Sequence, residues 1–158
     1  MIRASSGTSE FPTTPILEDR IELIVPAGHR AAAGAPVRLA ALAGEPFIFF
    51  ARSAAPHYHD RIMQACRTAG LDLAVTQEAE SWGATLALVR AGFGVSIGTS
   101  SLRGAAFPGV AFCAIADPMP DVSFHIARDG ARTSPLAAKV AAVLGQGLRE
   151  AEKAGQKT

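Results

Sequence analysis

The sequence has few cysteines and no long hydrophobic run. Its two cysteines, Cys66 and Cys113, lie far apart in apolar surroundings and form no C-x-x-C pair. This pattern favours two reduced, buried thiols over a disulfide framework or a zinc site. No stretch approaches the ~20 apolar residues of a transmembrane helix, and residues 1–10 lack the apolar core of a secretory signal. We therefore expect a cytoplasmic protein with no membrane partner.

The sequence also lacks a strong charge of either sign. It has 15 basic and 14 acidic residues, for a net charge of +1. A domain that binds DNA on its own usually carries a basic stripe or a much higher isoelectric point, so this chain is not expected to do so. In contrast, hydrophobic residues make up 49% of the 158 positions, which is enough to form the core of one domain or of two small lobes.

Hydrophobic periodicity and turn residues predict alternating strands and helices. The expected strands are residues 20–26, 47–50, 73–79, 95–97, 110–115 and 122–127, and the expected helices are residues 37–43, 56–70, 81–91 and 134–151. Residues 4–15 read as a loop. This order indicates an α/β fold with a largely parallel sheet.

Two glycine motifs resemble known sites without their structural context. Residues 94–98 match G-x-S-x-G, the nucleophile elbow of serine hydrolases, but Ser96 stands between two β-branched residues inside a predicted strand. Residues 92–94 (G-F-G) follow a helix, whereas a dinucleotide fingerprint follows a strand. We therefore expect no catalytic residue and no cofactor, and a serine hydrolase is the least favoured reading.

The segment His57-Tyr58-His59-Asp60 is rich in potential metal ligands. On a helix, however, His57 and His59 point about 200° apart, so one helix cannot bring both to one ion. No metal site is predicted. His57 at the helix N-terminus either faces a ligand or lies on a solvated surface.

Small polar groups follow three of the predicted strands. They are Arg52-Ser53, Ser81-Trp82 and Thr99-Ser100-Ser101. Ligands bind outside the carboxyl ends of parallel strands, and the first two groups lead into helix N-termini, which favour anions. These residues either form a site for a small carboxylate or serve only as caps and loop residues.

Three stretches resemble the effector-binding domain of LysR-type transcriptional regulators. They are L-E-D-R-I-E-L-I-V-P-A-G-H-R (17–30), V-R-L-A-A-L-A-G-E-P-F-I-F-F (37–50) and E-A-E-S-W-G-A-T-L-A-L-V-R-A-G-F-G-V-S-I (78–97). The stretch F-F-A-R-S-A-A-P-H-Y-H-D (49–60) is similar to members that respond to aromatic-catabolite acids such as muconate or benzoate. The resemblance spans residues 14–150.

The resemblance implies a type II periplasmic-binding-protein-like α/β fold, with one complete Rossmann-like lobe and an incomplete second lobe. It divides the chain into a remnant of the first lobe (1–44), a complete second lobe (45–117) and a return to the first lobe with a C-terminal helix (118–158). The strand near Ile21 and Leu23 would then have an unpaired edge through which the chain self-associates.

The implied function is sensing of a small organic acid effector, without catalysis. A homo-oligomer is implied, and DNA contact only through a helix-turn-helix domain absent from this chain. The alternative is a free-standing small-molecule binding lobe. Carried over by position, the effector-binding residues are Arg52, Ser53, Trp82, Thr85, Thr99 and Ser100, to which the helix argument adds His57.

Overall fold

A computed structural model describes residues 2–4, 13–127, 139–140, 142–143 and 147. The chain divides into two compact units, each considered by itself. The larger unit comprises residues 20–120, and the smaller unit comprises residues 1–19 and 121–158.

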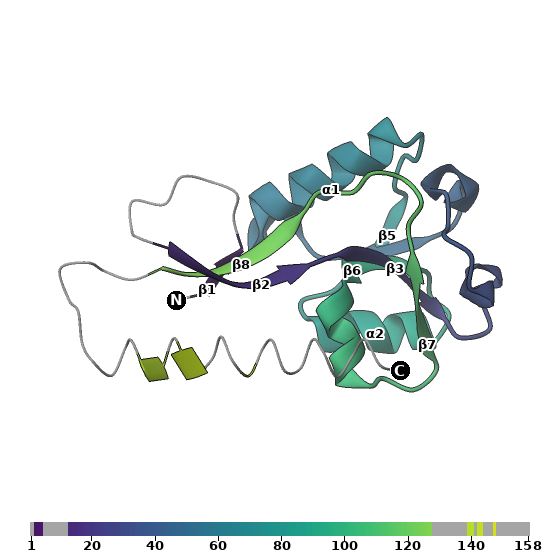
Figure 1. Ribbon diagram of the computed structural model, residues 1–158. Coiled ribbons are helices and arrows are strands. Elements are labelled where there is room, and N and C mark those ends of the chain that lie inside the picture. Colours follow the sequence, from purple (N-terminus) through teal and green to yellow (C-terminus); the bar gives the residue numbers. More distant parts are fainter. Residues whose placement is uncertain (1, 5–12, 128–138, 141, 144–146, 148–158) are drawn as a thin grey trace. The chain divides into compact units, whose positions relative to one another are not determined.

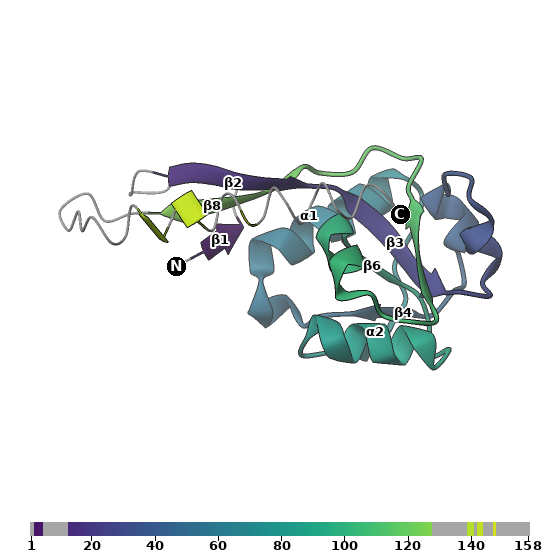
Figure 2. The same ribbon diagram turned by 60° about the horizontal axis from the view of Figure 1, so that its bottom comes forward.

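The larger unit is built on a mixed sheet in the strand order β5-β4-β6-β3-β7. Figure 1 labels β3, β5, β6 and β7, and Figure 2 labels β4. Its strands are β3 (Ile21–Pro26), β4 (Phe47–Phe49), β5 (Val75–Glu78), β6 (Ser96–Thr99) and β7 (Val110–Ala114). β3 pairs antiparallel with both β6 and β7, and β4 pairs parallel with β5. A parallel bridge from Phe47 to Val95 joins β4 to the start of β6. The α/β fold is confirmed, but the two antiparallel pairings of β3 mean that the sheet is not largely parallel.

Two α-helices cover opposite faces of this sheet (Figure 2). They are α1 (Pro56–Thr68) and α2 (Trp82–Arg90). Pro56 occupies the first turn of α1, where its missing N–H costs nothing. The Ser81 hydroxyl caps α2 by accepting a hydrogen bond of 3.2 Å from the backbone N–H of Ala84. Both helices begin where the sequence predicted.

The predicted helix at residues 37–43 is only a short 3-10 helix, η2 (Leu39–Leu42). The backbone of Val37 explains the difference, because it is already hydrogen-bonded across the sheet edge. Its N–H donates to Ala114 and its carbonyl accepts from Ala116, both at 2.8 Å. Three further 3-10 helices complete the larger unit: η1 (Arg30–Ala33), η3 (Arg52–Ala54) and η4 (Ser100–Ala105).

The structure divides the chain at residue 20, whereas the sequence predicted a lobe that begins at residue 45, because β3 belongs to the larger unit. β3 forms ladders with β6 and β7 on its two sides, and its side chains Leu23, Ile24 and Val25 are fully buried. A central strand satisfies its backbone groups on both edges, so from Glu22 onward β7 covers the edge that was expected to be open near Ile21 and Leu23. The unit begins at residue 20 and ends at residue 120.

The smaller unit contains a three-stranded antiparallel sheet in the order β1-β8-β2. Its strands are β1 (Ile2–Ala4), β2 (Thr13–Asp19) and β8 (Val122–Ala127). β2 replaces the end of the loop predicted at residues 4–15, and residues 5–12 lie outside the described part. Most of the predicted helix at residues 134–151 also lies outside it, although residues 139–140, 142–143 and 147 are helical.

Candidate functional site

The carboxyl ends of β4, β5 and β6 lie at one edge of the sheet, because these strands run parallel. We call this the β4–β5–β6 edge. Phe50 follows β4, Trp82 follows β5 after a short turn, and Gly98 lies near the end of β6. The three strand ends chosen from the sequence are therefore brought to one region of the larger unit.

Five aromatic or imidazole rings gather at this edge and form a continuous chain of contacts. We call them the aromatic cluster, which consists of Phe49, Phe50, Tyr58, His59 and Trp82. Phe50 is central: its ring centroid lies 5.6 Å from Tyr58 in a stacked arrangement and 6.2 Å from Trp82 in an edge-to-face arrangement. His59 contacts Phe49 at 5.4 Å and Phe50 at 5.9 Å. Phe50, Tyr58, His59 and Trp82 all keep part of their surface exposed, so a ligand ring could stack against the cluster.

Trp82 also reaches β6, where it packs against bare backbone. A Cβ atom placed on Gly98 would lie 3.0 Å from Cζ3 of Trp82 and 2.8 Å from Cδ1 of Ile24. The absence of a side chain at Gly98 therefore makes room for the indole ring. Trp82 thus connects the ends of β4, β5 and β6.

Arg52 stands beside the aromatic cluster in a two-pronged ion pair with Asp60. Its Nε donates to Oδ1 at 2.7 Å and its Nη2 donates to Oδ2 at 2.6 Å. The hydrogen bonds from Arg52 lower the pKa of Asp60 to about 2, and the same bonds raise the pKa of Arg52. His59 Nδ1 lies 3.4 Å from Oδ1 of the same carboxylate. Both partners of the pair are well exposed to solvent.

The histidine that contacts this group is His59, whereas the sequence analysis selected His57. His57 is exposed on the first turn of α1, whereas His59 is largely buried and contacts both the aromatic cluster and Asp60. Ser53 is exposed in η3, next to Arg52. The sequence reasoning missed Phe50, Tyr58 and Asp60. The run F-I-F-F at residues 47–50, followed by Tyr58 at the next helix, was the available signal for the rings.

The hydroxyl groups of the remaining candidates are engaged or partly covered. Thr85 is only 3% exposed and its hydroxyl donates to the carbonyl oxygen of Ser81 at 3.1 Å. Thr99 is 6% exposed and its hydroxyl lies 3.1 Å from that of Ser101. Ser100 is partly buried, and its backbone N–H donates to the carbonyl oxygen of Arg20 at 2.8 Å. Of these three, Ser100 is the one with substantial exposed surface.

Ser96 lies at the start of β6, as predicted, and not on an exposed turn. Its side chain is fully buried, and its Oγ has no hydrogen-bond partner within the described part of the chain. A nucleophilic serine needs a base within hydrogen-bond reach. The geometry therefore does not support the hydrolase reading.

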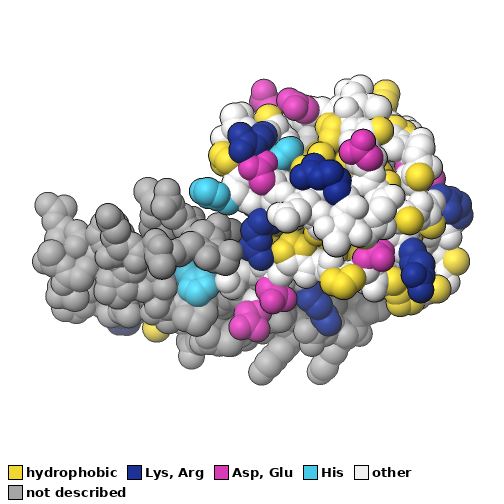
Figure 3. Space-filling model, turned by 90° about the horizontal axis from the view of Figure 1, so that it is seen from above, with side chains coloured by type: hydrophobic (Ala, Val, Ile, Leu, Met, Phe, Trp, Pro, Cys, Tyr) yellow, Lys and Arg dark blue, Asp and Glu magenta, His cyan; other side chains and the backbone are white. Residues whose placement is uncertain are grey.

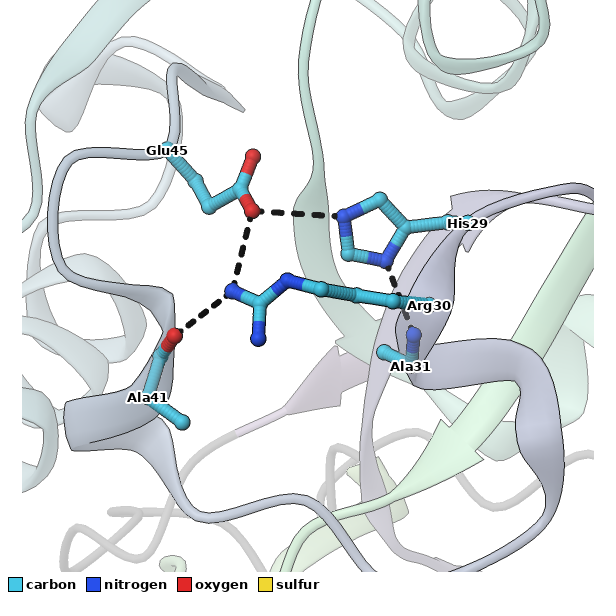
Figure 4. Close-up of polar contacts among 5 residues, drawn as sticks. All are labelled: His29, Arg30, Ala31, Ala41 and Glu45. Atoms are coloured by element: carbon cyan, nitrogen blue, oxygen red, sulfur yellow. Dashed lines mark hydrogen bonds and ion pairs between the residues drawn. The ribbon is translucent and has the colours of Figure 1, made fainter.

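A second polar cluster in the same unit joins His29 and Arg30 to Glu45 (Figure 4). Glu45 Oε1 accepts from Arg30 Nη2 at 3.1 Å and lies 3.4 Å from His29 Nε2. Arg30 also donates to the carbonyl oxygen of Ala41 at 2.7 Å, and His29 Nδ1 accepts from the backbone N–H of Ala31. Burial alone would raise the pKa of Glu45, but the hydrogen bonds from Arg30 and His29 outweigh it and lower that pKa. The contacts with Glu45 and Ala41 join the η1 region to the segment before β4, so the cluster has a structural role.

Basic, acidic and apolar side chains are interspersed on the face of the molecule shown in Figure 3, with no single-sign patch among the described residues. Within the described ranges, no group of His, Cys, Asp and Glu residues could hold a metal ion. The helices described also include none that is long and apolar enough to span a bilayer.

Comparison with known proteins identifies a family across almost the whole chain. The model of the LysR substrate binding domain matches residues 2–149. Among curated proteins, the HTH-type transcriptional regulator IlvR of Caulobacter vibrioides is 36% identical over 83 residues, which are 52% of this chain and 28% of IlvR. The HTH-type transcriptional regulator CatR of Pseudomonas putida is 31% identical over 88 residues, 56% of this chain and 30% of CatR. These relatives are transcriptional regulators, not enzymes.

Solved structures show the same fold. A mutant of OxyR from Corynebacterium glutamicum superposes with a TM-score of 0.74 at 17% identity, covering 99% of this chain and 51% of that one. The chain therefore spans about half the length of that regulator. The periplasmic-binding-protein-like α/β fold expected from the sequence is confirmed.

Proposed function

The chain belongs to the LysR substrate-binding domain family, and from that premise we propose that its larger unit binds a small aromatic or conjugated carboxylic acid at the β4–β5–β6 edge. Binding of this acid would be the signal that the regulator senses. The aromatic cluster beside Arg52 is the observation that carries the proposal. A planar acid has an apolar face that stacks on rings and a carboxylate that pairs with a guanidinium.

The candidate residues take different parts in this proposal. Arg52 supplies charge-assisted hydrogen bonds to the carboxylate, and Trp82 with Phe50 contacts the ring. Ser53 follows β4 and Ser100 follows β6, while His57 lies on the first turn of α1; all three keep exposed surface for further polar contacts. Thr85 and Thr99 support the site from behind, since both side chains are buried and hydrogen-bonded within the chain.

We extend the proposal to the whole regulator on the basis of the family. We assign DNA contact to the helix-turn-helix part that the names of IlvR and CatR record, and we assign this chain to effector sensing. We also propose a homo-oligomer that acts in the cytoplasm, where its DNA target would be.

Calorimetric titration of the whole chain with benzoate and with cyclohexanecarboxylate tests the proposal. We expect saturable binding of benzoate and weaker binding of the saturated acid, because only the planar ring can stack on Phe50 and Trp82. Arg52→Gln should weaken benzoate binding about tenfold, which is the usual value of one charge-assisted pair.

Arg67→Gln is the matched control, since it removes an exposed arginine from the last turn of α1, away from the edge. It should leave the dissociation constant unchanged. Equal losses in the two variants would show that the effect is one of net charge and would place the acid elsewhere.

A further inference from the structure

The ion pair between Arg52 and Asp60 uses only one edge of the guanidinium. An arginine side chain has five N–H hydrogens in a rigid plane. Asp60 takes the Nε hydrogen and one hydrogen of Nη2, at 2.7 and 2.6 Å. Within the described part of the chain, the other Nη2 hydrogen and both Nη1 hydrogens have no partner, and one hydrogen of each nitrogen points in parallel from the neighbouring Nη1–Nη2 edge. That edge matches a second carboxylate.

The carboxylate of Asp60 is itself held in place. Asp60 is on the second turn of α1, and His59 Nδ1 lies 3.4 Å from its Oδ1. The His59 ring is packed against Phe49 and Phe50. The orientation of the guanidinium is therefore connected to the aromatic cluster through two side chains of one helix.

We propose that Asp60 is a positioning residue for ligand recognition, which holds Arg52 side-on so that its Nη1–Nη2 edge faces a planar carboxylate. This inference rests on the proposed function, because it assigns Asp60 to the same site. It also has a consequence for specificity. The Arg52–Asp60 pair has no net charge, so the affinity for an anion depends more on two directed hydrogen bonds than on net electrostatic attraction. A flat carboxylate is therefore bound in preference to a tetrahedral anion.

Asp60→Asn removes the pair while preserving size. The amide offers one acceptor oxygen, and its NH₂ group cannot accept from Nη2, so Arg52 loses its fixed orientation but becomes an uncompensated cation. Asp72→Asn is the matched control, because Asp72 is exposed in the loop after α1 and its loss changes the net charge equally. Asp60→Glu keeps a carboxylate and should recover part of the effect.

The experiment is calorimetric titration of the whole chain and these variants with benzoate and, separately, with sulfate. We expect Asp60→Asn to weaken benzoate binding about threefold or more relative to Asp72→Asn, while sulfate binding stays equal or strengthens. The ratio of benzoate affinity to sulfate affinity should therefore decrease in Asp60→Asn, and Asp60→Glu should restore part of that ratio. A mere loss of structure in Asp60→Asn would weaken the binding of both anions, and that result would contradict the positioning role.

The outcomes separate the two proposals. If the unmodified chain does not bind benzoate, both are wrong. A second outcome is that the chain binds benzoate and Arg52→Gln weakens this binding, but Asp60→Asn binds benzoate as tightly as Asp72→Asn or more tightly and keeps the same ratio of benzoate to sulfate affinity. In that case only the positioning role is overturned. If Arg52→Gln has no effect on benzoate binding, the carboxylate lies elsewhere and the positioning role falls with the assigned site.

Discussion

The buried hydroxyl of Ser96 provides a direct stability test of the structure. Ser96 lies opposite Ile24 in the β3–β6 ladder, and Ile24 belongs to the apolar cluster that α2 covers. The Ser96 side chain is fully buried and its Oγ has no hydrogen-bond partner in the described part of the chain. Leaving a buried hydroxyl unpaired costs about 1–3 kcal/mol relative to water. Ser96→Ala removes that cost and leaves a void of only one oxygen atom.

We therefore expect Ser96→Ala to raise the free energy of unfolding by about 1 kcal/mol, which corresponds to a rise in Tm of about 4–8 °C for a unit of about 100 residues. Ser81→Ala deletes the same atom but should have the opposite effect. The Ser81 hydroxyl accepts the N–H of Ala84 at 3.2 Å, and loss of an N-cap costs about 0.5–2 kcal/mol. Net charge is unchanged in both variants.

Urea unfolding monitored by tryptophan fluorescence measures both variants, since the single tryptophan of the chain, Trp82, lies in the larger unit. The reasoning fails if Ser96→Ala loses stability by 1 kcal/mol or more in this assay. Such a loss would mean that the hydroxyl makes a stabilising hydrogen bond in solution.

Three further predictions follow from single groups in the larger unit. Gly94→Ala should destabilise it by about 1–3 kcal/mol in urea unfolding, because the new Cβ would lie 2.4 Å from the carbonyl oxygen of Pro46 and force β4 away from β6. Burial raises the pKa of Cys66 to about 11, so its thiol should react with an aromatic disulfide reagent at pH 8 only after unfolding; rapid reaction in the native state would contradict this burial. The pKa of Glu45 is lower in the folded state than in the unfolded state. Its pairing with Arg30 therefore stabilises the protein fully when the pH is above the unfolded-state pKa, and this stabilisation is lost as the pH falls through the folded-state pKa. Glu45→Gln should therefore make the free energy of unfolding depend less on pH in that range, which urea unfolding at a series of pH values measures.

Local signals in the sequence were reliable where one segment decides the structure. Ser81 and Pro56 predicted the starts of α2 and α1, because a cap or a first-turn proline depends only on the residues of its own turn. The four-residue run at 47–50 predicted a strand buried on both faces, and β4 is fully buried. The strand ends that carry the candidate site followed from the same reasoning.

Contacts between distant segments were not predictable in this way. Arg52 and Asp60 are eight residues apart and belong to different helical turns, so no helical spacing rule pairs them. The rings of Phe50 and Trp82 meet because the strands that they follow, β4 and β5, are neighbours in the sheet, and because Gly98 of β6 has no side chain. The contact of His59 with the aromatic cluster could not be predicted for the same reason, since only the packing of α1 decides which histidine reaches the cluster.

The position of β3 is the largest difference between sequence and structure, and it leads to a last prediction. Because β3 is the strand hydrogen-bonded on both sides by β6 and β7, a fragment of residues 20–120 should fold alone, whereas residues 45–117 should not. The shorter fragment loses five fully buried aliphatic side chains, namely Leu23, Ile24, Val25, Leu39 and Leu42. Burial of each is worth about 1.5–3 kcal/mol, so the loss is comparable to the whole free energy of unfolding of a domain, about 5–15 kcal/mol. Circular dichroism and urea titration of both fragments provide the measurement. A cooperative unfolding transition in the fragment 45–117 would show that β3 is dispensable and that the unit does not begin at residue 20.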